Sequence, residues 1–203
     1  MADTWTPAAI RRTYRWMAPL YDHWFRRAYE GMRRESLAGP GVQPGGTVLA
    51  IGVGTGLDLP LLPPVGRILA ADLSPSMLRR AARKPVSSPV DVFVADGARL
   101  PLPERSVSAA ILHLVLCSAP DGRALLAETA RVLEAGGEVA ILDHFAPHGA
   151  MRRWRRLGSR FAWVLGTRID RRFQPMVEGL PFEVLRDKPV AGGLYRIIRL
   201  RRL

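Results

Sequence analysis

The sequence predicts an α/β fold in which a mostly parallel sheet carries helices on both faces. Short apolar runs alternate with helical patterns between residues 47 and 141, as in chains that build parallel sheets. The first run leads into three glycines at alternate positions, and the next two runs end in aspartates. Ligands of such sheets bind beyond the carboxyl ends of the strands, so these residues are expected to line one crevice.

The first strand is predicted over residues 47–51. This run is apolar and rich in β-branched residues, and a turn signal of one proline and two glycines precedes it. Gly52, Gly54 and Gly56 follow, and glycine permits positive φ while leaving no side chain to block a ligand. Residues 57–62 are then predicted to begin a helix whose amide donors face the crevice. The same glycine pattern is also compatible with a tight turn that holds no ligand.

Two further strands are each predicted to end in a carboxylate. Residues 67–72 end in Asp72, twenty residues after the first glycine, where an acid can accept hydrogen bonds from both ribose hydroxyls. A helix then starts with Ser74 as its cap and a proline at its first position. Residues 90–95 repeat the pattern and lead into Asp96. Both acids are therefore expected at the ligand-binding edge of the sheet.

Over residues 45–145 this arrangement resembles the class I S-adenosylmethionine-dependent methyltransferases. The resemblance implies a Rossmann-like fold with a seven-stranded, mostly parallel sheet, and S-adenosylmethionine as the cofactor, released as S-adenosylhomocysteine. In that family the glycine loop holds the methionine part, the acid matching Asp72 binds the ribose, and the acid matching Asp96 reaches the adenine amine. Residues 111–115 look like the fourth strand and its exit, and residues 131–141 like the helix, Gly-Gly turn and fifth strand. The cofactor-binding residues so implied are Gly52, Gly54, Thr55, Gly56, Asp72, Leu73, Ser74, Met77, Asp96, Gly97, Ala98 and His113.

One position departs from the family pattern. The family often carries an acid two residues before the first glycine, where it supports the loop, and this chain has Ala50 there. A nicotinamide-dependent dehydrogenase is the competing interpretation of the glycine loop. That class requires G-x-G-x-x-G, but Leu57 occupies the third glycine position, and the remaining length leaves no room for a hydride-acceptor domain.

The composition predicts one domain with a sizeable core. The chain has 203 residues, of which 48% are hydrophobic. Its single cysteine, Cys117, allows no internal disulfide, suits a reducing cytosol and is expected to be a small buried residue. The amino terminus lacks a secretion signal, and no uninterrupted apolar run reaches the roughly eighteen residues of a membrane span. We therefore expect a cytoplasmic monomer that binds no metal.

The net charge of +12 is concentrated in two segments. Residues 1–34 contain seven arginines and three acidic residues (+4), and residues 151–172 contain eight arginines and one acidic residue (+7). Residues 35–150 come to −2, from nine basic and eleven acidic residues. We therefore divide the chain into an amino-terminal helical segment, 1–34, and a cofactor-binding domain, 35–203.

Both basic segments combine arginines with apolar residues at helical spacing. Trp5, Trp16 and Trp24 lie in the first segment, which its prolines divide into two or three short helices. In the second, residues 150–165 place Trp154 and Phe161 on one helical face and arginines on the other. This composition is typical of helices that lie in a membrane interface, and the first segment is a candidate lid.

Two other interpretations of these segments stay open. An amphipathic helix most often packs on the core of its own protein, with its arginines solvated. Arginine clusters also contact the phosphates of nucleic acids. We expect no nucleic-acid partner, because the apolar faces are continuous and no recognisable RNA-binding appendage is present. At an anionic membrane each arginine adds roughly 1 kcal/mol, which predicts peripheral association with the inner face of the cytoplasmic membrane.

The segments around the core narrow the resemblance. Residues 14–22 resemble the Y-x-x-x-A-P-x-Y-D signature of methyltransferases acting on membrane quinones and of soluble bacterial phospholipid N-methyltransferases. Residues 142–145, the basic helix after them and residues 193–200 look more like the phospholipid enzymes. The resemblance implies successive methylation of phosphatidylethanolamine towards phosphatidylcholine. Methylation of a quinone precursor is the alternative, and a non-catalytic peripheral lipid-binding protein is a third possibility.

The candidate acceptor site follows from the chemistry of an amine. An alkylammonium has no lone pair, so it must lose a proton to a phenol, imidazole or carboxylate before it is methylated. Tyrosine rings also attract cations such as a sulfonium or methylated ammonium. The catalytic candidates are Tyr14, Tyr21 and His144, and the further substrate-binding candidates are Arg153, for the lipid phosphate, and Tyr195. Tyr21 could equally be a core aromatic and His144 a histidine satisfied within the fold.

Overall fold

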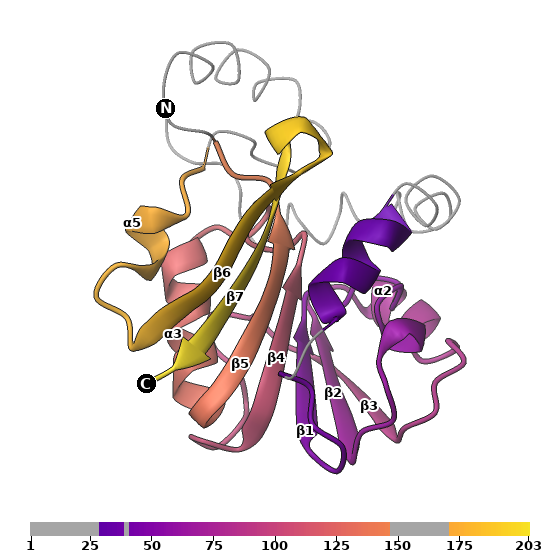
Figure 1. The fold of residues 1–203 in the computed structure, drawn as a ribbon. Coiled ribbons are helices and arrows are strands. Elements are labelled where there is room, and N and C mark those ends of the chain that lie inside the picture. The colour runs from indigo at the N-terminus through magenta and orange to yellow at the C-terminus, as the bar shows by residue number, and fades with distance from the viewer. Residues whose placement is uncertain (1–28, 39–40, 147–170) are drawn as a thin grey trace.

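A computed structural model describes residues 29–38, 41–146 and 171–203 (Figure 1). Seven strands form one sheet in the order β3-β2-β1-β4-β5-β7-β6, which confirms the predicted fold class. The strands are β1 (Thr47–Ile51), β2 (Arg67–Asp72), β3 (Val90–Val94), β4 (Val107–His113), β5 (Leu133–Asp143), β6 (Phe182–Val190) and β7 (Tyr195–Arg202).

The strand order places a switch point between β1 and β4. From β1 the chain moves outward through β2 to β3, then returns to pair β4 with the other side of β1, all in parallel. The carboxyl ends of β1 and β4 therefore flank a crevice, which is where open α/β sheets bind ligands. β7 runs antiparallel to β5 and pairs Arg196 with Asp143. The start of β7 consequently lies at this same edge of the sheet.

Each face of the sheet is buried by its own set of helices. On one face α3 (Gly122–Val132) and α5 (Gln174–Val177) contribute to a cluster that includes Leu49 and Leu126. On the other, α2 (Pro75–Ala81), the 3₁₀ turn η1 (Leu59–Leu61) and the helix over residues 29–37 pack around Val48 and Leu78. Successive residues of β1 thus enter opposite clusters, which explains its apolar sequence.

The prediction that a helix begins over residues 57–62 is wrong. Only η1 forms there, and no α-helix separates β1 from β2. Pro60 lies in the first turn, and Pro63 and Pro64 follow it, so a longer helix would lack the amide donors it needs. Asp58 precedes η1 without capping it, because its side chain accepts no hydrogen bond from the turn.

The predicted start of α2 is confirmed in position but not in detail. Ser74 is the residue before the helix and Pro75 is its first residue. However, the Ser74 hydroxyl lies 2.8 Å from the hydroxyl of Ser76 and does not cap an amide.

The 3₁₀ turn η3 (Ala191–Gly193) joins β6 to β7 near the carboxyl end of the described residues.

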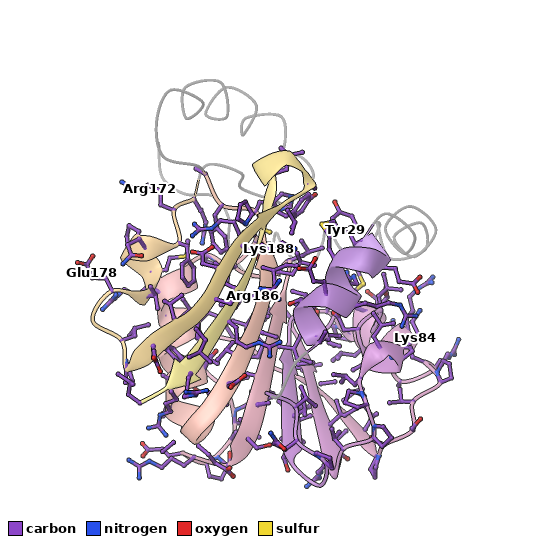
Figure 2. All side chains as sticks on the ribbon, viewed as in Figure 1. Tyr29, Lys84, Arg172, Glu178, Arg186 and Lys188 are labelled. Carbon is purple, nitrogen blue, oxygen red and sulfur yellow. The ribbon has the colours of Figure 1, made fainter. Side chains whose placement is uncertain are left out.

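Polar contacts tie the helix over residues 29–37 to the distant carboxy-terminal strands. Arg186 and Lys188 lie on β6, as Figure 2 shows. They donate hydrogen bonds to Glu35 at 2.7 Å and 2.6 Å. From β7, Arg199 donates to the carbonyls of Ser36 and Ala38 at the end of the helix. The exposed ion pairs add little energy, but together these contacts fix the orientation of the helix.

The amphipathic helix predicted over residues 150–165 and most of the segment 1–34 lie outside the described residues. Tyr14, Tyr21 and Arg153 fall within these stretches. The described helix over residues 29–37 crosses position 34, at which the sequence analysis divides the chain. Among residues 29–38, 41–146 and 171–203, no helix has both the length and the apolar character to span a bilayer.

Candidate functional site

A cleft opens at the carboxyl ends of β1, β2 and β4, at the switch point of the sheet. It is lined by loop backbone, apolar side chains and a few charged groups, as sites for small molecules commonly are. Nine of the residues expected to bind the cofactor line it: Gly52, Gly54, Thr55, Asp72, Leu73, Met77, Asp96, Gly97 and His113. Gly56, Ser74 and Ala98 are not among the lining residues.

All three loop glycines have positive φ, and Gly54 and Gly56 need it for different reasons. Gly54 has a φ of 56°, and a Cβ built there would have only the Gly52 carbonyl oxygen nearby, at 4.0 Å. Its backbone is therefore open to a ligand. Gly56 has a φ of 80°, and a Cβ there would lie 2.9 Å from the Cα of Ala81 in α2. Gly56 thus allows the loop to pack on α2, which explains why it does not line the cleft.

Asp72 joins the glycine loop to the start of α2. One carboxylate oxygen accepts the Gly54 amide and the other accepts the Ser74 amide, each at 2.8 Å. Burial raises the pKa of Asp72, while these two hydrogen bonds act to lower it. Each carboxylate oxygen has a further lone pair. The group can therefore accept ligand hydroxyls while it holds the loop.

Asp96 follows β3 in a tight turn at the same edge. Its carboxylate accepts the backbone amide of Ala98 at 3.0 Å, which explains why Ala98 supports the turn from outside the cleft. Gly97 is required between them because a Cβ there would lie 2.6 Å from Ile51 in β1. The turn therefore holds the Asp96 side chain against the cleft.

Opposite these acids the cleft contains a buried ionic cluster of Arg33, Asp58 and His113. Arg33 comes from the helix over residues 29–37, Asp58 precedes η1 and His113 ends β4. The Oδ1 atom of Asp58 lies 2.6 Å from Arg33 Nη1 and 2.7 Å from His113 Nδ1. The Nε2 atom of His113 lies 3.0 Å from the hydroxyl of Ser36. Of this cluster, only His113 is predicted from the sequence as a site residue.

The Asp58 carboxylate is buried but stays ionised. Burial by itself opposes ionisation, but the charges and hydrogen bonds of His113 and Arg33 outweigh it and hold the pKa of Asp58 well below its usual range. The sequence signal for Asp58 is its place two residues after Gly56, ahead of prolines that prevent a helix from forming there. Arg33 carried no comparable local signal.

A second polar group lies at the same edge of the sheet, where β5 ends and β7 starts. The hydroxyls of Tyr29 and Tyr195 are 2.5 Å apart, and their rings pack edge to face. The ring of His144, which follows β5, lies 4.2 Å from the ring of Tyr195 between centroids. The structure thus brings together two of the residues predicted for the acceptor site. Tyr29, which completes the group, was not predicted.

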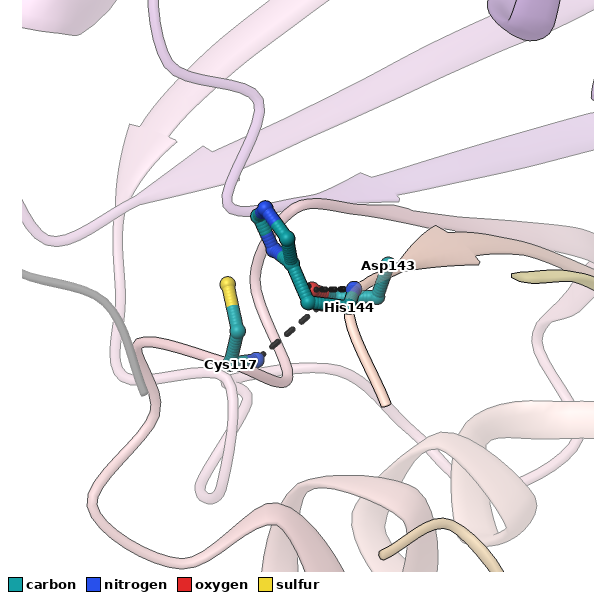
Figure 3. A group of neighbouring side chains, drawn as sticks. All are labelled: Cys117, Asp143 and His144. Carbon is teal, nitrogen blue, oxygen red and sulfur yellow. Dashed lines mark hydrogen bonds and ion pairs between the residues drawn. The ribbon is translucent and has the colours of Figure 1, made fainter. Parts of the chain in front are cut away.

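Asp143 holds the loop after β4 against the end of β5 (Figure 3). Its side chain is fully buried and accepts the backbone amides of His144 at 2.7 Å and Cys117 at 3.1 Å. The Nδ1 atom of His144 lies 3.5 Å from the same carboxylate. Cys117 is buried as expected, and its Sγ lies within 4.8 Å of ligand atoms of both neighbours. The two amide bonds already give Asp143 a structural role, and the absence of a metal stays a prediction.

Comparisons with known proteins place this site in a family. A family model described as a methyltransferase domain matches residues 49–141. The phosphatidylethanolamine N-methyltransferase of Cereibacter sphaeroides is 32% identical over 200 residues, covering 96% of this chain and 98% of that protein. The chain belongs to the class I S-adenosylmethionine-dependent methyltransferases. Its cofactor is S-adenosylmethionine, as expected from the glycine loop and the two acids.

Other similar proteins match a smaller part of the chain or share its fold at low sequence identity. The ubiquinone/menaquinone C-methyltransferase of Desulfotalea psychrophila is 30% identical over 118 residues, which are 57% of this chain and 48% of that protein. A geranyl diphosphate methyltransferase solved with S-adenosylmethionine has a TM-score of 0.69 and 16% identity, covering 87% of this chain and 85% of that one. The structural likeness shows the fold alone.

Acid should weaken the methyltransferase through Asp58. Because the folded-state pKa of Asp58 is lowered, its ion pairs stabilise the fold above pH 4 and lose this effect as pH falls below that value. At pH 7, Asp58→Asn is expected to cost about 3 to 5 kcal/mol, since it leaves Arg33 buried without its carboxylate. Urea unfolding at pH 7 and pH 3.5 measures both effects. The difference between variant and wild type should shrink at pH 3.5, and an unchanged difference would contradict the assignment.

Proposed function

We propose that the methyltransferase transfers methyl groups to the amine of phosphatidylethanolamine and its mono- and dimethyl forms, towards phosphatidylcholine. The observation that carries the proposal is the likeness to the Cereibacter sphaeroides enzyme over nearly the whole of both chains. The quinone methyltransferases match less: that of Desulfotalea psychrophila covers 57% of this chain, and a demethylmenaquinone methyltransferase of Tropheryma whipplei covers 76% at 26% identity. The likeness to the phospholipid enzyme thus includes the segments that flank the cofactor domain.

The group of Tyr29, His144 and Tyr195 supplies the acceptor site in this proposal. Tyr29 lies four residues before Arg33 on one helix, just over one turn or about 6 Å along its axis. Since Arg33 lines the cofactor cleft, the tyrosine pair is close to that cleft. The electron-rich faces of tyrosine rings attract ammonium groups, at about 0.5 to 2 kcal/mol each. These rings are therefore suited to hold a lipid amine as it gains methyl groups.

His144 is the proposed proton acceptor. Burial and the hydrogen bond to Tyr29 raise the pKa of Tyr195 above its usual range, so Tyr195 stays protonated at neutral pH. A protonated phenol can orient the amine but cannot remove its proton. The His144 imidazole beside it contacts Asp143 and the Tyr195 ring, which hold it in place. This imidazole can accept the proton and pass it to water.

The chain must then align two partners and exclude water. When bound, S-adenosylmethionine supplies a methyl group made electrophilic by a positive sulfur. The neutral lipid amine forms a bond to that methyl carbon as the carbon–sulfur bond breaks, with the electron pair leaving on sulfur. The glycine loop and the two acids hold one partner, and the aromatic group holds the other. Further rounds need only a new cofactor and another proton transfer, until the amine has no proton left.

Membrane association is the second part of the proposal. The amine substrate lies in a bilayer, and the arginine-rich segments 1–34 and 150–165 flank the cofactor domain. We place these segments on the anionic inner face of the cytoplasmic membrane, with an arginine such as Arg153 on the lipid phosphate. The enzyme is taken to act as a monomer.

Incubation with methyl-labelled S-adenosylmethionine and vesicles tests the substrate. Vesicles of phosphatidylethanolamine with phosphatidylglycerol should yield labelled methylated lipids on thin-layer chromatography. Vesicles of phosphatidylcholine with phosphatidylglycerol are the control and should yield none. Label in an added demethylmenaquinone, with none in the lipid, would instead support the quinone alternative.

His144→Asn should lower kcat about 100-fold because it removes the proton acceptor. Tyr195→Phe keeps the ring and removes only the hydroxyl, so we expect a loss below tenfold. Initial rates on the phosphatidylethanolamine vesicles give kcat and KM, and calorimetry with S-adenosylhomocysteine checks that cofactor affinity is unchanged in both. A wild-type kcat in His144→Asn would eliminate His144 as the base.

A further inference from the structure

The two ends of the cofactor cleft differ in charge. Asp72 and Asp96 lie at the ends of β2 and β3, whereas Arg33, Asp58 and His113 lie beside β1 and β4. S-adenosylmethionine is equally two-ended, with an adenosine at one end and an amino acid at the other. An amino acid carries an ammonium and a carboxylate close together. Its binding site therefore needs an anion and a cation side by side.

The ionic cluster offers this combination in a fixed geometry. Arg33 and Asp58 form an ion pair at 2.6 Å, and their side chains are only 6% and 7% exposed. Both residues nevertheless line the cleft. His113 contacts the same carboxylate oxygen from β4 and the Ser36 hydroxyl from the helix, so Asp58 is held from two sides. The pair is thus preorganised in a largely dry environment, where charge-assisted hydrogen bonds are strongest.

Stability alone is a poor explanation of this pair. Buried ion pairs are seldom more stabilising than apolar residues of the same volume, because both charges lose their hydration. Asp58 also does not cap η1, so its carboxylate has no local backbone role there. A zwitterion adds no net charge to a neutral ion pair, and a ligand of that kind can enter without an unbalanced buried charge. An amino-acid group satisfies this condition with its carboxylate and ammonium on one carbon, whereas the phosphate and ammonium of a lipid head group are separated by an ethylene chain.

We propose that Arg33 and Asp58 form the subsite for the amino-acid end of S-adenosylmethionine. The guanidinium of Arg33 binds the carboxylate, since its planar fork can contact Asp58 and a second carboxylate together. Asp58 accepts a hydrogen bond from the ammonium. His113 and Ser36 are positioning residues that hold Asp58. The cofactor site therefore extends to the helix over residues 29–37, which precedes the region matched by the family model.

A pair of ligands tests the subsite without any acceptor substrate. S-adenosylhomocysteine has the amino-acid end, and 5′-methylthioadenosine has the same adenosine and thioether without it. Calorimetry gives the affinity of wild type, Arg33→Gln and the control Arg34→Gln for both ligands. Arg34 is the next residue of the helix, is 62% exposed and pairs with Glu30. Arg33→Gln should lose roughly 10- to 100-fold affinity for S-adenosylhomocysteine and less than threefold for methylthioadenosine.

The alternatives give different results. An equal loss for both ligands would mean that Arg33 only supports the fold, and no loss for either would mean that the amino-acid end binds elsewhere. If Arg33→Gln does not fold, the wild type is compared with S-adenosylhomocysteine and its decarboxylated analogue, and Arg33→Lys with the same two. The penalty for removing the carboxylate should be smaller in Arg33→Lys, because lysine lacks the planar fork. A penalty of equal size would overturn the proposal, whatever the identity of the methyl acceptor.

Discussion

Asp72→Ala is expected to abolish binding of S-adenosylmethionine and to leave the fold intact. The alanine removes the acceptor for the ribose hydroxyls and releases the Gly54 amide that shapes the loop. Two hydrogen bonds to a charged acceptor correspond to a loss of about 100-fold or more in affinity. Isothermal titration calorimetry with S-adenosylmethionine measures it, and circular dichroism reports the fold.

The fold is expected to survive because Asp72 stabilises it little at neutral pH. A folded-state pKa that is raised above its unfolded value favours the fold only while the group is protonated, and that effect is lost as pH rises. Asp91→Ala is the matched control, because Asp91 is an exposed acid on neighbouring β3 that pairs with Arg67. The Asp91→Ala variant should bind S-adenosylmethionine with the affinity of the wild type. Undiminished binding in Asp72→Ala would move the ribose to another part of the cleft.

Gly56→Ala is expected to destabilise the protein by about 2 to 5 kcal/mol. A positive φ costs an L-residue roughly 1 to 2 kcal/mol, and overpacking adds about 1 to 3 kcal/mol. Both apply at Gly56, which has a φ of 80° and would bring its Cβ within 2.9 Å of the Cα of Ala81. Because that contact is with backbone, α2 must shift to relieve it. Urea unfolding at pH 7 measures the loss.

Gly136→Ala separates the two causes. Gly136 has a φ of 76°, close to that of Gly56, but a Cβ there would have nothing within 4 Å. Its substitution should therefore cost only the backbone part, about 1 to 2 kcal/mol. Equal losses in the two variants would show that the approach of the glycine loop to α2 is not limiting.

The cofactor part of the site was accessible from the sequence because its signals are local. Each strand, glycine turn and terminal acid lies within a few consecutive residues, and the parallel sheet brings these ends to one edge. The prediction failed between β1 and β2, where residues 57–62 have the apolar pattern of a helix. There the backbone limits of three prolines outweigh the pattern and allow only a 3₁₀ turn.

The rest of the site could not be predicted, because its contacts join residues that are far apart in the sequence. Asp58 and His113 are 55 residues apart, and Tyr29 and Tyr195 are 166 residues apart. No local pattern reports such contacts. They exist because β4 returns to the centre of the sheet and β7 starts at the edge where β5 ends, beside the helix over residues 29–37.

The sequence by itself thus determined the α/β class, the strand ends and the glycine loop with its two acids, since periodicity and backbone freedom are properties of neighbouring residues. Only the tertiary structure decided which charged and aromatic side chains meet these elements. A lone arginine on a helix, such as Arg33, has the same local pattern whether it is solvated or buried against Asp58. Burial and pairing depend on strand order, and strand order is a property of the whole sheet.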